Sequence, residues 1–216
     1  SWTWRKQPKF FDVVTWLGDL VAGREIPHSL GVAPGMVFIK KTDGSEPWHV
    51  WNKGASNGLL RLDTTEAIDP EYMFNVLGDG NGGPSGNVIL PSSTNITVGT
   101  NVNNVYNDGS PGGIPNEYIA YVFAHDDADE SMVKCGSFSY TAGTPLAVNL
   151  GFEAQWVITK RTDGSEHWYM ADIMRGMYDG DGPYLAANLS NAEGAIGVAA
   201  ATATGFIFDP GTNNMP

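Results

Sequence analysis

The stretch Lys40-Lys41-Thr42-Asp43-Gly44-Ser45-Glu46-Pro47-Trp48 returns 120 positions later as Lys160-Arg161-Thr162-Asp163-Gly164-Ser165-Glu166-His167-Trp168. The same offset relates Leu30-Gly31 to Leu150-Gly151. A fixed offset over this length indicates that one structural unit is used twice. Repeated units commonly present a surface or extend a shape, so the repeat weakens any hypothesis of a single active site.

The repeat extends in both directions and changes register once. Upstream, Gly23 falls on Gly143 at the same offset of 120. Downstream, after an insertion at 179–182, Gly99 aligns with Gly211 at an offset of 112. The second unit therefore follows the first over nearly its whole length.

The two ends of the chain predict the boundaries of the two units. The first unit continues into an apolar segment at 118–123, and its counterpart in the second unit would lie beyond the last residue. At the other end of the chain, Trp2-Thr3-Trp4 resembles the end of that apolar segment. We therefore expect a slice of a longer array. Its first unit is residues 1–127, in which 1–5 are the closing strand of an upstream unit. Its second unit is residues 128–216 and lacks its last strand.

The composition and the local patterns predict an all-β fold. The chain has 216 residues, of which 42% are hydrophobic and 11% aromatic, enough for packed cores. Short β-branched or aromatic segments bounded by Gly, Pro, Asn or Asp predict strands. These segments are 10–16, 36–41, 48–52, 118–124, 132–140, 156–161 and 168–173. Asp43-Gly44 and Asp163-Gly164 predict tight type I′ turns. We expect two tandem antiparallel β-sandwich domains related by the internal repeat.

The charge and the cysteine count narrow the possible partners. Acidic residues outnumber basic ones by 24 to 12, which gives a net charge of −12 and no basic cluster for a phosphate backbone. We therefore expect no nucleic-acid partner. No apolar run reaches the roughly 18 residues of a membrane span, so we expect no membrane insertion. The single cysteine, Cys135, cannot form an internal disulfide, and we expect it to be buried.

The segment Trp48-His49-Val50-Trp51 holds the candidate ligand-binding residues. Alternation along a strand places Trp48 on one face and His49 and Trp51 on the other. Because Trp168 repeats Trp48, we interpret Trp48 as core packing. Trp51 has Ala171 at its counterpart, so His49 and Trp51 are candidates for stacking on a glycan, with edge packing as the alternative.

The remaining motifs predict little chemistry. Asp126, Asp127 and Asp129 offer oxygen ligands that could hold Ca²⁺, with a solvated linker as the alternative; we expect no other cofactor. The glycines at 78–83 match a dinucleotide fingerprint but precede no helix. The four histidines lack zinc spacing, and no nucleophile elbow is present. We therefore expect no catalytic residues and no enzyme.

Several phrases together resemble a family of repeat modules in phage virion proteins, found in tail-fibre and tailspike-like proteins of marine phages. They are 4–15, 26–36, 119–125, 133–137 and 172–177. The resemblance implies a concanavalin-like or jelly-roll β-sandwich in a virion appendage. It implies no catalytic or receptor residue.

Three functions follow as hypotheses. The first is a phage virion structural protein, in a tail fibre, appendage or capsid decoration, which contacts the host surface and forms a homo-oligomer with copies of itself or with other virion proteins. The second is a lectin-like module that binds host surface glycans. The third and weakest is a polysaccharide-degrading tailspike enzyme, which would need two converging carboxylates.

Overall fold

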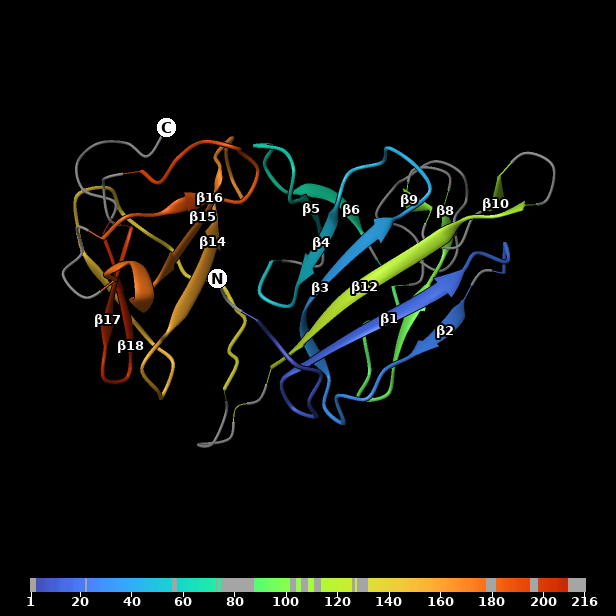
Figure 1. The fold of residues 1–216 in the computed structure, drawn as a ribbon, viewed down its shortest axis with the longest axis horizontal. Helices are drawn as coiled ribbons and strands as arrows, with labels where there is room; N and C mark the ends of the chain where they lie inside the picture. The colour runs from blue at the N-terminus through green and yellow to red at the C-terminus, as the bar shows by residue number, and fades with distance from the viewer. Residues whose placement is uncertain are drawn as a thin grey trace. The chain divides into compact units, whose positions relative to one another are not determined.

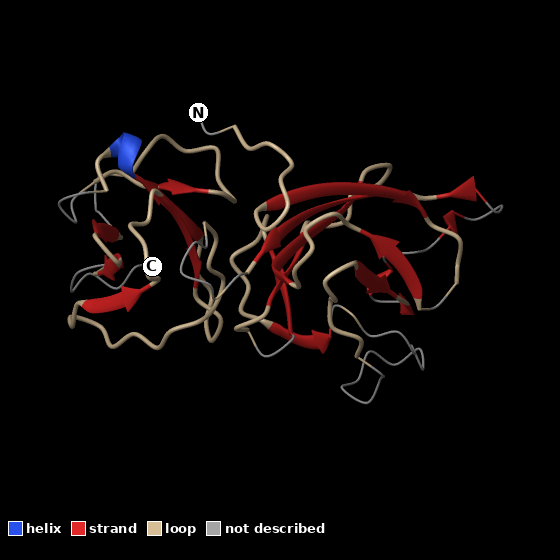
Figure 2. Ribbon diagram, turned by 90° about the horizontal axis from the view of Figure 1, so that it is seen from below, coloured by secondary structure: helices blue, strands red, loops and turns tan. Residues whose placement is uncertain are grey.

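The computed structural model consists almost entirely of strands and loops (Figures 1 and 2). It describes residues 3–21, 23–55, 58–72, 74, 88–101, 104–105, 109–110, 114–125, 127, 132–177, 182–194 and 198–209. Within these residues the helical structure is one 3₁₀ turn, η1 (Ile173–Arg175), and no helix is long and apolar enough to cross a membrane. The all-β prediction is confirmed.

The chain divides into two compact units. Unit 1 comprises 1–61 and 68–136, and unit 2 comprises 62–67 and 137–216. Each unit contains antiparallel sheets and a hydrophobic core made from its own residues.

Unit 1 is built on a six-stranded antiparallel sheet in the order β1-β12-β3-β4-β5-β6. The strands are β1 (Phe11–Leu17), β12 (Glu117–Ala124), β3 (Pro34–Lys41), β4 (His49–Asn52), β5 (Gly58–Arg61) and β6 (Asp69–Tyr72). The long strands β1, β12 and β3 lie side by side in Figure 1. Shorter pairs complete the unit: β2 (Arg24–Pro27) with β7 (Asn95–Val98), β8 (Thr100–Asn101) with β9 (Asn104–Val105), and β10 (Gly109–Ser110) with β11 (Ile114–Pro115).

The core of unit 1 lies between the large sheet and the β2–β7 pair. Alternate residues of β12, among them Ala120 and Val122, are fully buried, and Val37 and Ile39 of β3 join them. Ile26 and Ile96, which face each other in the β2–β7 pair, belong to the same cluster. This alternation of period two is why one face of each strand is buried.

Unit 2 contains two three-stranded antiparallel sheets. Their orders are β14-β15-β16 and β13-β18-β17. The strands are β13 (Leu146–Asn149), β14 (Trp156–Lys160), β15 (Trp168–Asp172), β16 (Leu185–Ala186), β17 (Ala199–Thr202) and β18 (Gly205–Phe208). Val157, Tyr169 and Ala171 of one sheet share a buried cluster with Phe206 and Phe208 of the other.

Most predicted strands are present, and two local predictions are wrong. Residues 132–140 are irregular, although their counterparts in unit 1 form β1. In unit 1 that strand pairs with β12, and among the described residues unit 2 has no equivalent partner. Gly44 and Gly164 do not adopt the positive φ of a type I′ turn, because the loops from Lys41 to His49 and from Lys160 to Trp168 are too long to require one.

Two strand pairs of unit 1 and two of unit 2 have registers that differ by constant numbers of residues. In the β3–β4 pair Met36 lies opposite Asn52, and in the β14–β15 pair Trp156 lies opposite Asp172. Both residue numbers of the second pair exceed those of the first by 120. In the β2–β7 pair Ile26 lies opposite Ile96, and in the β13–β18 pair Leu146 lies opposite Phe208. Here the residue numbers differ by 120 between Ile26 and Leu146 and by 112 between Ile96 and Phe208. These are the offsets of the sequence repeat.

Two pairs of glycines adopt the same unusual backbone conformation. Gly23 and Gly143 have φ of 79° and 76°, and Gly31 and Gly151 have φ of 72° and 84°. Positive φ costs little for glycine and is strained for other residues. The turns before β2 and β13 and those after them therefore need glycine for the same reason.

Candidate interaction surface

The structure places Trp51 in the core of unit 1. Its side chain is 3% exposed, and its ring contacts Phe74 edge to face with centroids 5.6 Å apart. Trp51 is therefore not an exposed aromatic that could stack on a glycan, and the alternative of packing is confirmed. In β4 it lies opposite Val37, whose side chain points into the core, so the alternation of β4 turns the indole inward. His49, two residues away, is half-buried opposite Ile39 and Arg61.

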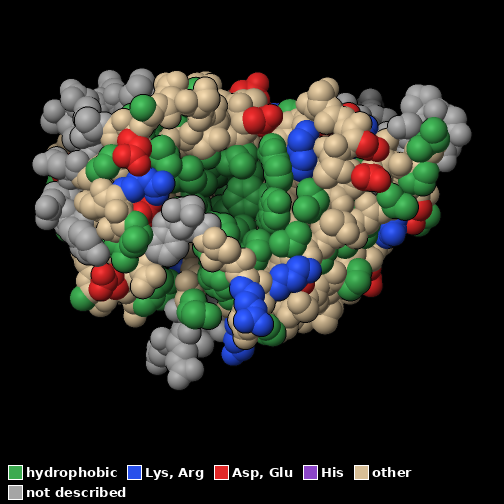
Figure 3. Space-filling model, viewed as in Figure 1, with side chains coloured by type: hydrophobic (Ala, Val, Ile, Leu, Met, Phe, Trp, Pro, Cys, Tyr) green, Lys and Arg blue, Asp and Glu red, His purple; other side chains and the backbone are tan. Residues whose placement is uncertain are grey.

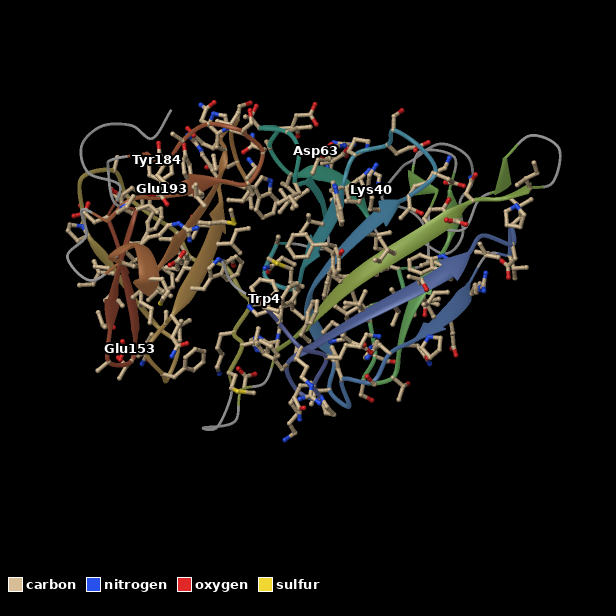
Figure 4. All side chains as sticks on the ribbon, viewed as in Figure 1. Trp4, Lys40, Asp63, Glu153, Tyr184 and Glu193 are labelled. Carbon is tan, nitrogen blue, oxygen red and sulfur yellow. The ribbon has the colours of Figure 1, made fainter. Side chains whose placement is uncertain are left out.

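The second face of the large sheet carries a row of aromatic rings, which we call the aromatic face. The rings of Trp48 and Tyr121 are stacked with centroids 5.7 Å apart, and Tyr121 stacks on Phe11 at 6.1 Å. Trp4 contacts Phe123 edge to face at 5.2 Å and lies beside this row (Figure 4). Hydrophobic side chains gather over β3, β4 and β12 in Figure 3. The sheet thus has two apolar faces.

Asp127, in the acidic segment after β12, has two side-chain partners. The carboxylate of Asp127 accepts hydrogen bonds from His125 at 3.0 Å and from Lys134 at 3.1 Å. Asp126 and Asp129 lie outside the described residues. In the described ranges no group of three or more His, Cys, Asp or Glu side chains is placed to hold a metal ion.

Cys135 lies beside this segment and is not activated as a nucleophile. Its backbone N–H donates to Nδ1 of His125 at 3.1 Å. Burial raises the pKa of the Cys135 thiol to about 12, with Lys53 opposing the shift. The residue therefore stays a thiol at neutral pH, and the thiolate is the nucleophilic form.

The repeated loop has a role in unit 1 that the sequence did not suggest. The carboxylate of Asp43 accepts the backbone N–H of Glu117 at 3.1 Å, and the N–H of Thr42 donates to the carbonyl of Glu117 at 2.8 Å. Thr42 and Asp43 therefore hold the first residue of β12. The sequence predicts only a turn at Asp43, because nothing local in it pairs this residue with one 74 positions away.

Unit 2 keeps both loop residues but has no strand for them to hold within the described part of the chain. Asp163 repeats Asp43, its side chain is 82% exposed, and it accepts from Nε of Arg161 at 2.8 Å. Thr162, which repeats Thr42, is half-buried. No described strand pairs with β14 on the side opposite β15.

A cluster of ionisable residues lies at the end of the same sheet. Glu166 is buried and accepts from the hydroxyl of Tyr169 at 3.3 Å, while its backbone N–H donates to the carbonyl of Thr65 at 2.8 Å. Nζ of Lys160 donates to the carbonyl of Thr65 at 3.2 Å. Burial lowers the pKa of Lys160 to about 8, with Glu166 opposing and Arg161 assisting the shift.

The depressed pKa of Lys160 predicts a pH-dependent stability. Between pH about 8 and 10.5 the unfolded chain binds a proton that the folded chain lacks, so the free energy of unfolding rises with pH across this window. The side chain is half-buried, so we expect a rise of about 1 kcal/mol or less. Urea unfolding at pH values from 7.5 to 10.5 measures this rise in the free energy of unfolding. Lys160→Gln should flatten the rise and Lys40→Gln, its counterpart in unit 1, should not. An identical rise in both variants would contradict the assignment.

Comparison with known proteins adds a family but no function. No curated protein and no solved structure matches the chain. One family model covers both units together, matching residues 5–209. The chain belongs to the family of the domain of unknown function DUF7483.

Proposed function

We propose that the chain is a structural component of a phage virion, in a tail fibre, another appendage or a capsid decoration. It acts through assembly contacts with copies of itself or with other virion proteins, at a position from which it can contact the host surface, and it performs no catalysis. The two units are copies of one β-sandwich module.

The observation that carries the proposal is the matched strand pairing of the two units. Both β3–β4 and β14–β15 pair in registers that differ by the offset of the sequence repeat, and so do β2–β7 and β13–β18. Tandem copies of a rigid module extend a shape and present surfaces, which is what a fibre or decoration protein needs. The phrases that resemble phage virion modules point the same way.

Two surface properties support assembly. A net charge of −12 keeps a protein soluble until a specific partner binds. A strand at the edge of its sheet presents backbone donors and acceptors that another chain can pair with, and among the described residues β14 ends its sheet. The module is therefore equipped to join neighbours.

The proposal is tested on intact particles of the phage that encodes the chain. Antibodies against residues 1–216 should label a tail appendage or the capsid surface in electron micrographs, and mass spectrometry should find the chain in purified particles. A chain found in infected cells and missing from purified particles would reject the proposal.

A further inference from the structure

We propose that His28 is a proton-sensitive latch in unit 1, which releases the loop of residues 28–31 when its imidazole ring takes up a proton. This loop, which we call the His28 loop, lies between β2 and β3. The latch is a conformational device that goes beyond the proposed function and does not depend on it.

The first support is the use of both ring nitrogens of His28. The backbone nitrogen of Leu30 lies 3.3 Å from Nδ1, and the carbonyl oxygen of Ser92 lies 3.2 Å from Nε2. A backbone N–H can only donate and a carbonyl can only accept, so Nδ1 carries no proton and Nε2 carries one. The neutral ring therefore satisfies both partners, and a second proton on Nδ1 removes the acceptor of Leu30.

The second support is the place of the His28 loop in unit 1. Leu30 is 0% exposed and belongs to the buried cluster of this unit. Its carbonyl accepts the N–H of Lys9 at 2.8 Å, and Ser29 donates to Asp12 from its N–H at 2.7 Å and from its hydroxyl at 2.8 Å. A change at Leu30 therefore reaches β1 and the turn that precedes it.

Burial of the ring sets the direction of the response to pH. It lowers the pKa of His28 below 6.5, while the hydrogen bond to the Ser92 carbonyl and the carboxylate of Asp12 raise this pKa by less. Between the folded pKa and 6.5 the unfolded chain binds a proton that the folded chain lacks. The stabilisation by His28 is therefore present above pH 6.5 and is lost as pH falls through the lower folded value.

Few charged groups surround the ring. Those of the neighbouring elements are Asp12 of β1, Lys6 and Lys9 of the turn before it, and Glu25 of β2. Lys6 pairs with Asp12 at 3.1 Å. Residues 88–98, on the side of Ser92, include no ionisable side chain. Because the pKa of Asp12 lies below 3.8, its carboxylate stays charged at mildly acidic pH, and the change there is at His28.

Unit 2 offers a reference loop whose acceptor does not titrate. At the offset of 120, His28 corresponds to Val148 and Leu30 to Leu150. The N–H of Leu150 donates to the carbonyl of Thr204 at 2.7 Å. A carbonyl takes up no proton between pH 7.5 and 5.0, so the N–H of Leu150 keeps its acceptor where that of Leu30 loses one.

The test measures amide exchange of the full chain 1–216 by NMR at pH values from 7.5 to 5.0, together with the titration of the His28 ring. Exchange rates are divided by the intrinsic rate at each pH to give protection. The protection of Leu30 should fall by at least about tenfold, with the midpoint of the ring titration, because its N–H loses its acceptor. The protection of Leu150 should not change.

His28→Asn is the matched variant. Asparagine offers an uncharged Oδ1 to the N–H two residues ahead, as Asn149 does to Gly151 at 2.9 Å. The protection of Leu30 should therefore not depend on pH in this variant. His167→Asn removes a histidine from unit 2 by the same substitution and should leave the response of Leu30 unchanged.

Each outcome supports or rejects the latch. A loss of protection at Leu30 that follows the ring titration, is absent from His28→Asn and persists in His167→Asn supports it. Constant protection while the ring titrates, an equal loss in His28→Asn, or an equal loss at Leu150 overturns it. A His28 ring that takes up no proton above pH 5.0 also overturns it. If His28→Asn does not fold, the two midpoints in the unaltered chain decide, because the latch requires them to coincide.

Discussion

Replacing Trp51 by alanine is expected to lower the free energy of unfolding of unit 1 by about 3–5 kcal/mol, the usual cost of removing a large buried aromatic. The indole is 3% exposed and contacts Phe74 in the core. Its ring N–H has no hydrogen-bond partner among the described residues. Trp51→Phe removes that unpaired donor and keeps an aromatic ring, so it should cost clearly less. Urea unfolding followed by circular dichroism measures both variants.

Trp48→Ala is the matched control for Trp51. Trp48 is half-buried on the aromatic face and stacks on Tyr121, so its removal should destabilise the chain less than Trp51→Ala does. Equal losses in the two variants would contradict the burial of Trp51. A loss of glycan binding in Trp51→Ala would report a damaged core, so a glycan assay on this variant needs the stability measurement beside it.

Asp12→Ala is expected to lower the free energy of unfolding by about 2–3 kcal/mol, because it removes the hydrogen bonds that a buried carboxylate accepts. The Asp12 side chain is 4% exposed. It accepts from the N–H of Ser29 at 2.7 Å, from the Ser29 hydroxyl at 2.8 Å and from the N–H of Val13 at 2.8 Å. Lys6 pairs with it at 3.1 Å. The carboxylate therefore ties the loop after β2 to β1.

Asp12 also makes the stability of the fold depend on pH in the acidic range. Burial raises its pKa, but hydrogen bonds from Ser29, Lys6 and Val13 lower it by more, so the pKa lies below 3.8. The stabilisation is present above pH 3.8 and is lost as pH falls through the lower folded value. Thermal unfolding measured from pH 6 to pH 2.5 tests this. Below pH 4 the melting temperature of Asp12→Asn should fall less steeply than that of the unaltered chain.

Asp19→Ala controls for the loss of a carboxylate from unit 1. Asp19 pairs with Arg24 at 3.2 Å on the surface, where an ion pair contributes about 1 kcal/mol or less. A cost at Asp19 equal to that at Asp12 would show that burial is not the cause.

The candidate site was harder to predict than the fold. The sequence favours His49 and Trp51 as ligand-binding residues because Trp168 repeats Trp48, which predicts that Trp48 is the core residue, and because Ala171 stands at the counterpart of Trp51. The structure has the opposite arrangement at β4, since Trp51 lies in the core and Trp48 on the aromatic face. Alternation separates the two faces of a strand but does not say which is inside when both are apolar.

The sequence by itself determined the all-β class and most strand positions, because these depend on local alternation. Only the tertiary structure decided which face of β4 is buried, why 132–140 forms no strand, and that Thr42 and Asp43 hold β12. The reason is that strand pairing is non-local. A strand is stabilised by a partner far along the chain, and 132–140, which has a strand-like sequence, is irregular and pairs with no described strand.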